Sequence, residues 1–225
     1  MKQSQSLWTE YDVSWRFATK LCGSTPGRAD IVKPWLDARK PKARPPGGKS
    51  IEETQEEVMA TLAEPEPEFS STIFQRQNGG LVVRGHTVRA HLKECARVLS
   101  WHYIGRVQGE RSLQTKVKNC LYPDEYWIPI LRPDGEPIKN PDGEIDKPIH
   151  VNGPRGEVSA LKRFEYIEPS RIDFTLRVLG GAVKHSDLEH MMTYGGTHGY
   201  GGERSAGEGK YLYTITERKN GNGKT

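Results

Sequence analysis

Alternating apolar and polar residues mark several segments of the chain as half-buried β-strands. In residues 10–17, for example, Tyr11, Val13, Trp15 and Phe17 all fall on one side. The expected strands cover residues 10–17, 80–85, 171–178 and 210–216, and a further strand is expected to begin at 165–167. The alternation therefore predicts a sheet that is buried on one face.

Apolar residues at helical spacing predict helices elsewhere in the chain. The expected helices cover residues 51–62, 87–101 and 186–195. The second is the clearest, because beside its apolar stripe Arg89, Lys93 and Arg97 recur every four residues as a basic stripe. In the third, Ser186 is the expected N-cap and Gly195 the expected C-terminal stop.

The order of these elements is strand, helix, strands, strand, helix, strand, as in a ferredoxin-like (RRM-like) βαββαβ core. We therefore expect an α+β fold in one domain over residues 1–225, with long insertions. Residues 38–70, first basic and then acidic, are expected to be a mobile insertion. Residues 122–157 contain Pro-Asp-Gly-Glu twice and are expected to form a projecting hairpin. The polar residues 217–225 are expected to be a disordered tail.

The amino-acid composition limits the classes of protein to which this chain can belong. Hydrophobic residues make up 34% of the 225 residues, and the mean hydropathy is −0.73, so parts of the chain should be solvated insertions or surface covered by a partner. No window is apolar enough for a membrane span, which predicts a cytoplasmic protein that does not bind a membrane. The cysteines, Cys22, Cys95 and Cys120, lack metal-binding spacing. We expect neither a metal nor another cofactor.

Charge is segregated along the chain in a way that the net charge of +4 hides. Residues 16–49 hold nine Lys or Arg against two acids, whereas residues 50–70 hold seven acids and no base. Residues 71–120 again hold nine bases against two acids. A solvated surface explains any single run equally well, but the combination favours nucleic acid along one face.

Glycine is densest in residues 193–211, where seven glycines surround Arg204, Ser205 and Lys210. Glycines let a backbone approach a ligand closely, and the three polar residues suit phosphate. The segment does not match a P-loop, because Tyr211 follows Gly209-Lys210 in place of Ser or Thr. It is also no dinucleotide fingerprint, since a helix is expected before it where a strand is needed. A flexible surface loop is the competing interpretation.

Three blocks of sequence resemble the RAMP superfamily of CRISPR-associated proteins. The first is Leu21-Cys22-Gly23-Ser24-Thr25-Pro26, which is similar to the opening Gly-Ser turn of that superfamily. The segment from Val82 to Lys93 resembles its I-P-G-S-S-L-K-G-x-L-R turn and helix, with Arg84 and Ala90 in place of the usual Pro and second Gly. The segment from Gly199 to Lys210 is similar to its C-terminal loop G-x-G-G-x-R-S-x-G-x-G.

The resemblance implies a backbone subunit that coats single-stranded guide RNA and associates with further copies of itself and with other effector subunits. A target nucleic acid is a further partner that the resemblance implies. Such subunits insert a hairpin thumb between bases, and either residues 131–150 or residues 38–50 would supply it here. The residues expected to contact RNA are Lys20, Arg28, Arg84, His86, Arg89, Lys93, Gly201, Gly202, Arg204, Ser205 and Lys210.

Two branches of the superfamily cleave RNA, and each suggests a candidate residue. Metal-independent processing of repeat RNA uses a His with Lys or Tyr, for which His86 is the candidate. Cleavage of target RNA uses an Asp after the first strand, for which Asp30 is the nearest equivalent. Single residues of these types are usually structural, so we expect RNA binding without catalysis. A phage-type protein that binds single-stranded nucleic acid with the same fold is the third hypothesis.

Overall fold

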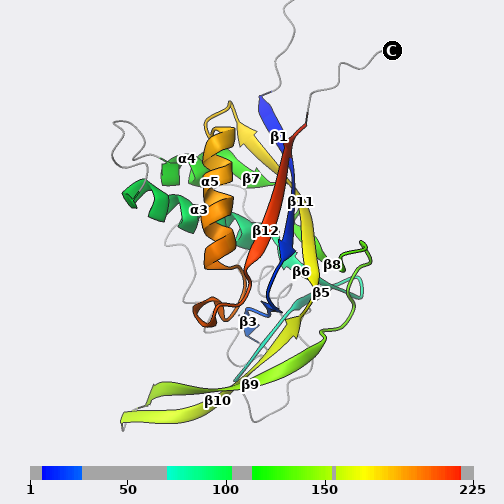
Figure 1. Ribbon diagram of the computed structural model, residues 1–225, viewed down its shortest axis with the longest axis vertical. Coiled ribbons are helices and arrows are strands. Elements are labelled where there is room, and N and C mark those ends of the chain that lie inside the picture. Colours follow the sequence, from blue (N-terminus) through cyan, green and yellow to red (C-terminus); the bar gives the residue numbers. More distant parts are fainter. Residues whose placement is uncertain (1–6, 27–69, 103–112, 154–155, 219–225) are drawn as a thin grey trace, which may run out of the picture.

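The computed structural model describes residues 7–26, 70–102, 113–153 and 156–218 (Figure 1). The described strands are β1 (Trp8–Phe17), β2 (Leu21–Cys22), β3 (Thr25–Pro26), β4 (Ser70–Ile73), β5 (Gln75–Gln77), β6 (Gly80–Arg84), β7 (Leu121–Pro123), β8 (Trp127–Leu131), β9 (Gly143–Gly153), β10 (Gly156–Ile167), β11 (Ser170–Leu179) and β12 (Tyr211–Glu217). The described helices are α3 (Gly85–His102), α4 (Leu113–Cys120) and α5 (His185–His198), with a 3-10 turn at Arg204–Ala206.

Several expectations fall outside the described residues. These are the helix at 51–62, nearly all of the insertion at 38–70, and the candidate residues Arg28 and Asp30. The expected tail at 217–225 begins too early, because Glu217 still pairs with Tyr11 in the sheet. Residues 219–225 lie outside the described part of the chain.

The central sheet has the strand order of a ferredoxin-like core. Its path is β12-β1-β11-β8-β6-β5, and β7 also pairs with β11. Strand β1 lies antiparallel between β12 and β11, and β7 and β8 pair antiparallel with the other edge of β11. With α3 before β7 and α5 between β11 and β12, this is a split βαβ arrangement with extra strands β5 and β6. The predicted α+β, ferredoxin-like fold is confirmed.

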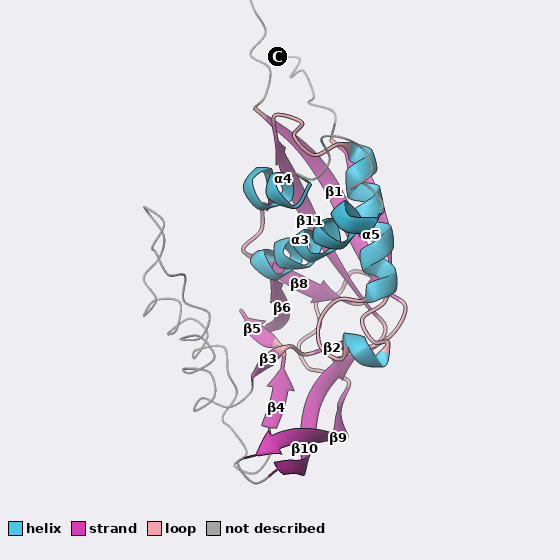
Figure 2. Ribbon diagram, turned by 90° about the vertical axis from the view of Figure 1, so that its left-hand side faces the viewer, coloured by secondary structure: helices cyan, strands magenta, loops and turns pink. Residues whose placement is uncertain are grey.

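One face of this sheet is covered by α3 and α5, which lie in front of β1, β11 and β8 in Figure 2. Strand register aligns the apolar residues on that face, since Val13 pairs with Phe174 and Trp15 with Ile172. Trp15 is completely buried. The alternation of apolar and polar residues in the sequence therefore arises because one face of the sheet packs against the helices.

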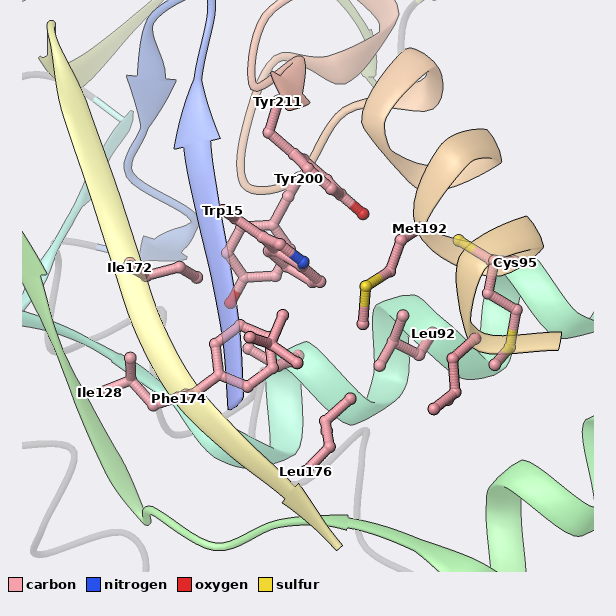
Figure 3. Packing of buried hydrophobic residues seen from close by; sticks show 14 of the residues in the cluster. Trp15, Leu92, Cys95, Ile128, Ile172, Phe174, Leu176, Met192, Tyr200 and Tyr211 are labelled. Atoms are coloured by element: carbon pink, nitrogen blue, oxygen red, sulfur yellow. The ribbon is translucent and has the colours of Figure 1, made fainter. Parts of the chain in front are cut away.

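An aromatic cluster fills the space between the sheet and the helices (Figure 3). Trp15 stacks on Tyr211 with 4.3 Å between ring centroids and packs edge-on against Tyr200 and Phe174. Since β1, β11, β12 and the glycine-rich segment each contribute a ring, burial of these rings joins the two ends of the chain in one core.

Both ends of helix α5 differ from the boundaries expected from the sequence. The backbone N–H of Lys184 donates to the Asp187 carboxylate at 3.1 Å, so the helix begins before Ser186. At the other end the helix runs through Gly195 and Gly196 to His198. A side chain on Gly196 would collide with the backbone carbonyl of Tyr211, and one on Gly195 with the Tyr211 hydroxyl. These glycines let α5 pack closely on β12 and do not end the helix.

A second sheet follows the order β2-β10-β4-β3, with β9 paired to β10. Strands β9 and β10 form a long antiparallel hairpin that extends away from the central sheet (Figure 1). This hairpin spans residues 143–167, further along than the expected 122–157, and its turn is at neither Asp-Gly pair. The Asp134-Gly135 turn lies after β8, and Asp142 precedes β9, where it accepts hydrogen bonds from Arg132 and from the Glu168 amide.

Candidate nucleic-acid interface

The glycine-rich loop, residues 199–210, is closed by backbone hydrogen bonds onto the segment after β1. Tyr200 and Gly209 bond across the loop at 2.8 Å, and the Gly209 amide donates to the Lys20 carbonyl at 2.8 Å. The Gly202 amide donates to the Cys22 carbonyl at 3.0 Å. The loop is thus an ordered part of the fold and differs from the flexible connector of the competing interpretation.

The glycines of this loop lie against protein backbone. A Cβ on Gly202 would collide with the carbonyl of Gly23, and a Cβ on Gly201 would lie 2.9 Å from the carbonyl oxygen of Cys22. Gly209 is equally confined by Tyr200. Packing of the loop on Cys22 and Gly23 therefore accounts for Gly201 and Gly202, and closure of the loop on Tyr200 accounts for Gly209. A close approach of RNA backbone at Gly201 and Gly202 stays a prediction.

The three sequence blocks that resemble the RAMP superfamily meet at this loop. Thr87, at the start of α3, lies 2.5 Å from Tyr200 between the two hydroxyl oxygens. The Gly202 amide reaches the first block through Cys22, and the Arg204 guanidinium reaches α3 through Glu94 at 2.9 Å. Segments separated by about 60 and 110 positions in the chain therefore build one surface.

Glu203 and Arg204 are neighbours that attach the glycine-rich loop to two different parts of the fold. Arg204 and His198 both contact the Glu94 carboxylate on α3. The Glu203 carboxylate instead accepts hydrogen bonds from Lys147 on β9 and Lys162 on β10, both at 2.8 Å. These contacts hold the loop between the helical layer and the β9–β10 hairpin.

The contacts of Glu203 lower the pKa of its carboxyl group. Burial alone would raise the pKa of its carboxyl group, but the hydrogen bonds and charges of Lys147 and Lys162 outweigh that effect and hold the pKa below its usual value. The carboxylate is therefore ionised at neutral pH, as is the Glu94 carboxylate, whose pKa Arg204 lowers against the opposing effect of burial.

Lys20, Ser205 and Lys210 lie on the exposed side of the same junction. The Lys20 ammonium lies 5.5 Å from the centre of the Tyr166 ring and 3.7 Å from a Glu168 carboxylate oxygen. Ser205 and Lys210 are exposed on the loop itself. With Gly201, Gly202 and Arg204, the structure brings six of the expected RNA-binding residues together.

Arg84 lies in a different environment from the one expected of a phosphate contact. Only 5% of the residue is exposed, and its Nε donates to Gln75 at 2.9 Å. Its guanidinium also lies over the Trp127 ring, 4.7 Å from the centroid. These protein partners give Arg84 a packing role between β5, β6 and β8.

Arg89, the first residue of the basic stripe of α3, lies beside the end of α4. The Arg89 guanidinium donates to the carbonyl of Lys118 and lies 4.2 Å from the centre of the Tyr122 ring. Lys93 is partly buried and His86 is exposed. Arg89 therefore helps to pack the two helices, and the glycine-rich loop takes its α3 contacts from Thr87 and Glu94.

The site residues expected from the sequence do not include His91, Lys147, Lys162 or Glu203. His91 is enclosed by the aromatic cluster, and burial, followed by the nearby Arg204, lowers its pKa to about 3. It is therefore neutral at physiological pH. The two lysines are ordinary members of alternating strands, and only the fold reveals that both reach the same carboxylate.

Much of the charge on the face of the central sheet opposite α3 and α5 is neutralised by neighbouring charges. Arg218 donates to Asp12 at 2.8 Å, and Arg171 lies 3.2 Å from Asp173. A shallow hollow on this face is lined by Asp12, Val13, Ser14, Arg16, Glu125, Arg171, Asp173, Phe174, Thr175, Thr214, Thr216 and Arg218. Acids accompany the arginines on this face, as Glu94, Glu168 and Glu203 accompany the cations of the glycine-loop junction, so charge alone does not rank the two surfaces.

The described residues hold no group of three or more His, Cys, Asp or Glu side chains arranged to bind a metal ion. In the same part of the chain, no helix has the length and apolar character needed to span a bilayer.

No protein-family model and no curated protein matches this sequence. Among solved structures, the chain is similar to one described as a "Type IV-B CRISPR Complex", with a TM-score of 0.45 and 12% sequence identity. That alignment covers 92% of this chain and 90% of the other. At this level of similarity, the function has to be argued from the residues of the site.

Proposed function

We propose that this chain is an RNA-binding backbone subunit of a CRISPR-type ribonucleoprotein effector, in which copies of it coat a single-stranded guide RNA. The RNA backbone would follow the junction between the glycine-rich loop, the segment after β1 and the base of the β9–β10 hairpin. Lysines and a serine of this junction would contact phosphates, and no catalytic step is included.

One observation carries this proposal. The three blocks that resemble the RAMP superfamily are far apart in the sequence, yet Cys22, Thr87 and Tyr200 bring them into hydrogen-bonded contact at a single place. Motifs that matched by chance would have no reason to meet. Their convergence supports a shared function for the three blocks, and their residue types suit a polyanion.

The hairpin offers a further element that suits the proposal. Strands β9 and β10 pair over eleven positions and project from the central sheet (Figure 1). Of the two candidate thumbs, residues 38–50 lie outside the described structure, whereas residues 143–150 form part of this hairpin. We propose that the β9–β10 hairpin is the thumb, because it is long and projects from the central sheet.

The proposal is tested by the nucleic acid that accompanies the tagged chain from its native cells. Sequencing should find RNA of uniform, guide-like length, in a complex whose mass corresponds to several copies of the chain. Absence of nucleic acid contradicts the proposal. Heterogeneous single-stranded nucleic acid on a single copy favours the phage-type alternative.

A salt titration provides an independent test in vitro. Binding to a single-stranded oligouridylate should weaken by orders of magnitude between about 50 and 200 mM salt, because several phosphate contacts release counterions. Affinity that is flat over this range contradicts a site built on lysine and arginine contacts to phosphate.

A further inference from the structure

Lys147 and Lys162 are directly opposite each other in the hairpin. They are paired residues of the β9–β10 register, and both ammonium groups bond to Glu203 of the glycine-rich loop. Two like charges at paired positions destabilise a hairpin. One carboxylate balances only one of them, so the group of three keeps an excess positive charge.

The arrangement leaves the two ammonium groups accessible while the carboxylate is covered. The side chains of Lys147 and Lys162 are 39% and 26% exposed, whereas that of Glu203 is 9% exposed. Each ammonium has three N–H donors, and one of them bonds to Glu203. The remaining donors are available to an anion that approaches from solvent.

Glu203 holds this position at a conformational cost. Its backbone has φ 55°, in the left-handed region that non-glycine residues rarely adopt. Glu203 is one of two non-glycine residues with positive φ in the described chain, the other being Asn78. Backbone strain of this kind is concentrated at ligand-binding and switch regions of proteins.

We propose that Lys147 and Lys162 form a phosphate-binding pair for single-stranded RNA, and that Glu203 occupies this pair until a phosphate displaces it. This inference rests on the proposed function and adds a site at the base of the hairpin. RNA binding then breaks the link between loop and hairpin, so the hairpin becomes free to reorient as the RNA is bound.

The hairpin also supplies a matched control. Arg163 and Asp146 are the next pair along the register and form their own ion pair at 2.8 Å. Because side chains alternate along a strand, this pair lies on the opposite face of the same hairpin. Its variants make the same changes of charge at a site that the inference leaves out.

Affinity of purified variants for a single-stranded oligouridylate tests the inference. Lys162→Gln should weaken binding about tenfold, the size expected for a lost charge-assisted hydrogen bond, and should lower the slope of log K against log salt by about 0.7. Glu203→Gln should strengthen binding by about two- to fivefold, the range for breaking a partly exposed ion pair. Arg163→Gln and Asp146→Asn should leave affinity within about twofold, as expected for surface changes outside the site.

The outcomes separate the inference from the function on which it rests. If the parent protein does not bind the oligonucleotide, both are overturned. If the parent binds and Lys162→Gln binds equally well, or if Glu203→Gln weakens binding while the control variants do not, only the inference is overturned.

A measurement on the unaltered protein avoids the question of whether a variant folds. Acetylation of lysines with acetic anhydride, read by mass spectrometry, should slow at Lys147 and Lys162 when oligouridylate is added. The exposed Lys184, before α5, is the reference and should react at an unchanged rate. Equal protection of all three lysines, or of none while RNA is bound, overturns the inference.

Discussion

The Nε2 atom of His91 lies 3.0 Å from the hydroxyl oxygen of Tyr211, and each of these residues is only 4% exposed. The imidazole thus sits inside the aromatic core, with Trp15 and Tyr200 also against it. This contact links α3 to β12, the last strand, and makes the core sensitive to protonation.

The free energy of unfolding is expected to fall as the pH drops below about 6.5. The folded protein holds the pKa of His91 at about 3, below its ordinary value of about 6.5, so between these values the unfolded chain binds more protons. Stability from the neutral imidazole is complete above the ordinary pKa and is lost toward the folded one, by about 1.4 kcal/mol per pH unit.

Urea unfolding at pH 7.5 and 5.5 measures this effect. In His91→Gln, which does not titrate, the loss of stability between the two pH values should be smaller by about 1.4 kcal/mol. An equal pH dependence in the variant and the parent shows that His91 is not the titrating group.

Replacement by alanine should affect stability and RNA binding differently at Gly202 and at Gly207. In Gly202→Ala the new Cβ meets the Gly23 carbonyl, so the loop must shift, at a cost of about 1–3 kcal/mol. At Gly207, with φ 89°, nothing lies within 4 Å, and only backbone strain of about 1–2 kcal/mol is expected. Denaturant unfolding compares the two costs, and RNA binding should fall more in Gly202→Ala, because its loop moves.

A larger loss of RNA binding in Gly207→Ala than in Gly202→Ala contradicts this ranking. Gly202→Val should be affected more strongly than Gly202→Ala in both stability and binding, since the side chain points at backbone. Gly223 lies outside the described residues and is expected to tolerate the same change.

Gly196→Ala is expected to destabilise the protein even though alanine favours helices. Helix propensity gains about 1 kcal/mol, but the Cβ collides with the Tyr211 backbone carbonyl, and such overpacking costs about 1–3 kcal/mol. Thr197→Ala, at the exposed neighbouring position, gains propensity without a collision and should be neutral or slightly stabilising. Thermal unfolding of the two variants decides whether packing of α5 on β12 requires this glycine.

The Arg84→Gln variant tests whether Arg84 packs within the fold or contacts phosphate. Loss of the buried hydrogen bond to Gln75 and of the contact with Trp127 should cost about 1–3 kcal/mol of stability. The salt dependence of RNA binding should stay that of the parent. A salt slope that falls by about 0.7 with stability unchanged contradicts the packing role, because that result is expected of a lost phosphate contact.

The sequence by itself determined the elements whose pattern is local. Alternation in β1 and β11 and the apolar stripe of α3 follow from which side of a strand or helix faces the core, and neighbouring residues reveal that side. The order of these elements then limited the topology to a ferredoxin-like core, because connections between sheet and helix layers obey few arrangements.

The tertiary structure alone decided how the site is assembled. Gly195 resembles a helix stop in sequence, yet it lies inside α5, where Gly195 and Gly196 pack closely on Tyr211. Arg84 resembles a surface cation until the fold places Trp127 beside it. Glu203 lies 41 positions from Lys162 in the sequence, and no local period connects them. Contacts of this kind depend on strand register and loop docking, which arise only when distant segments pack together.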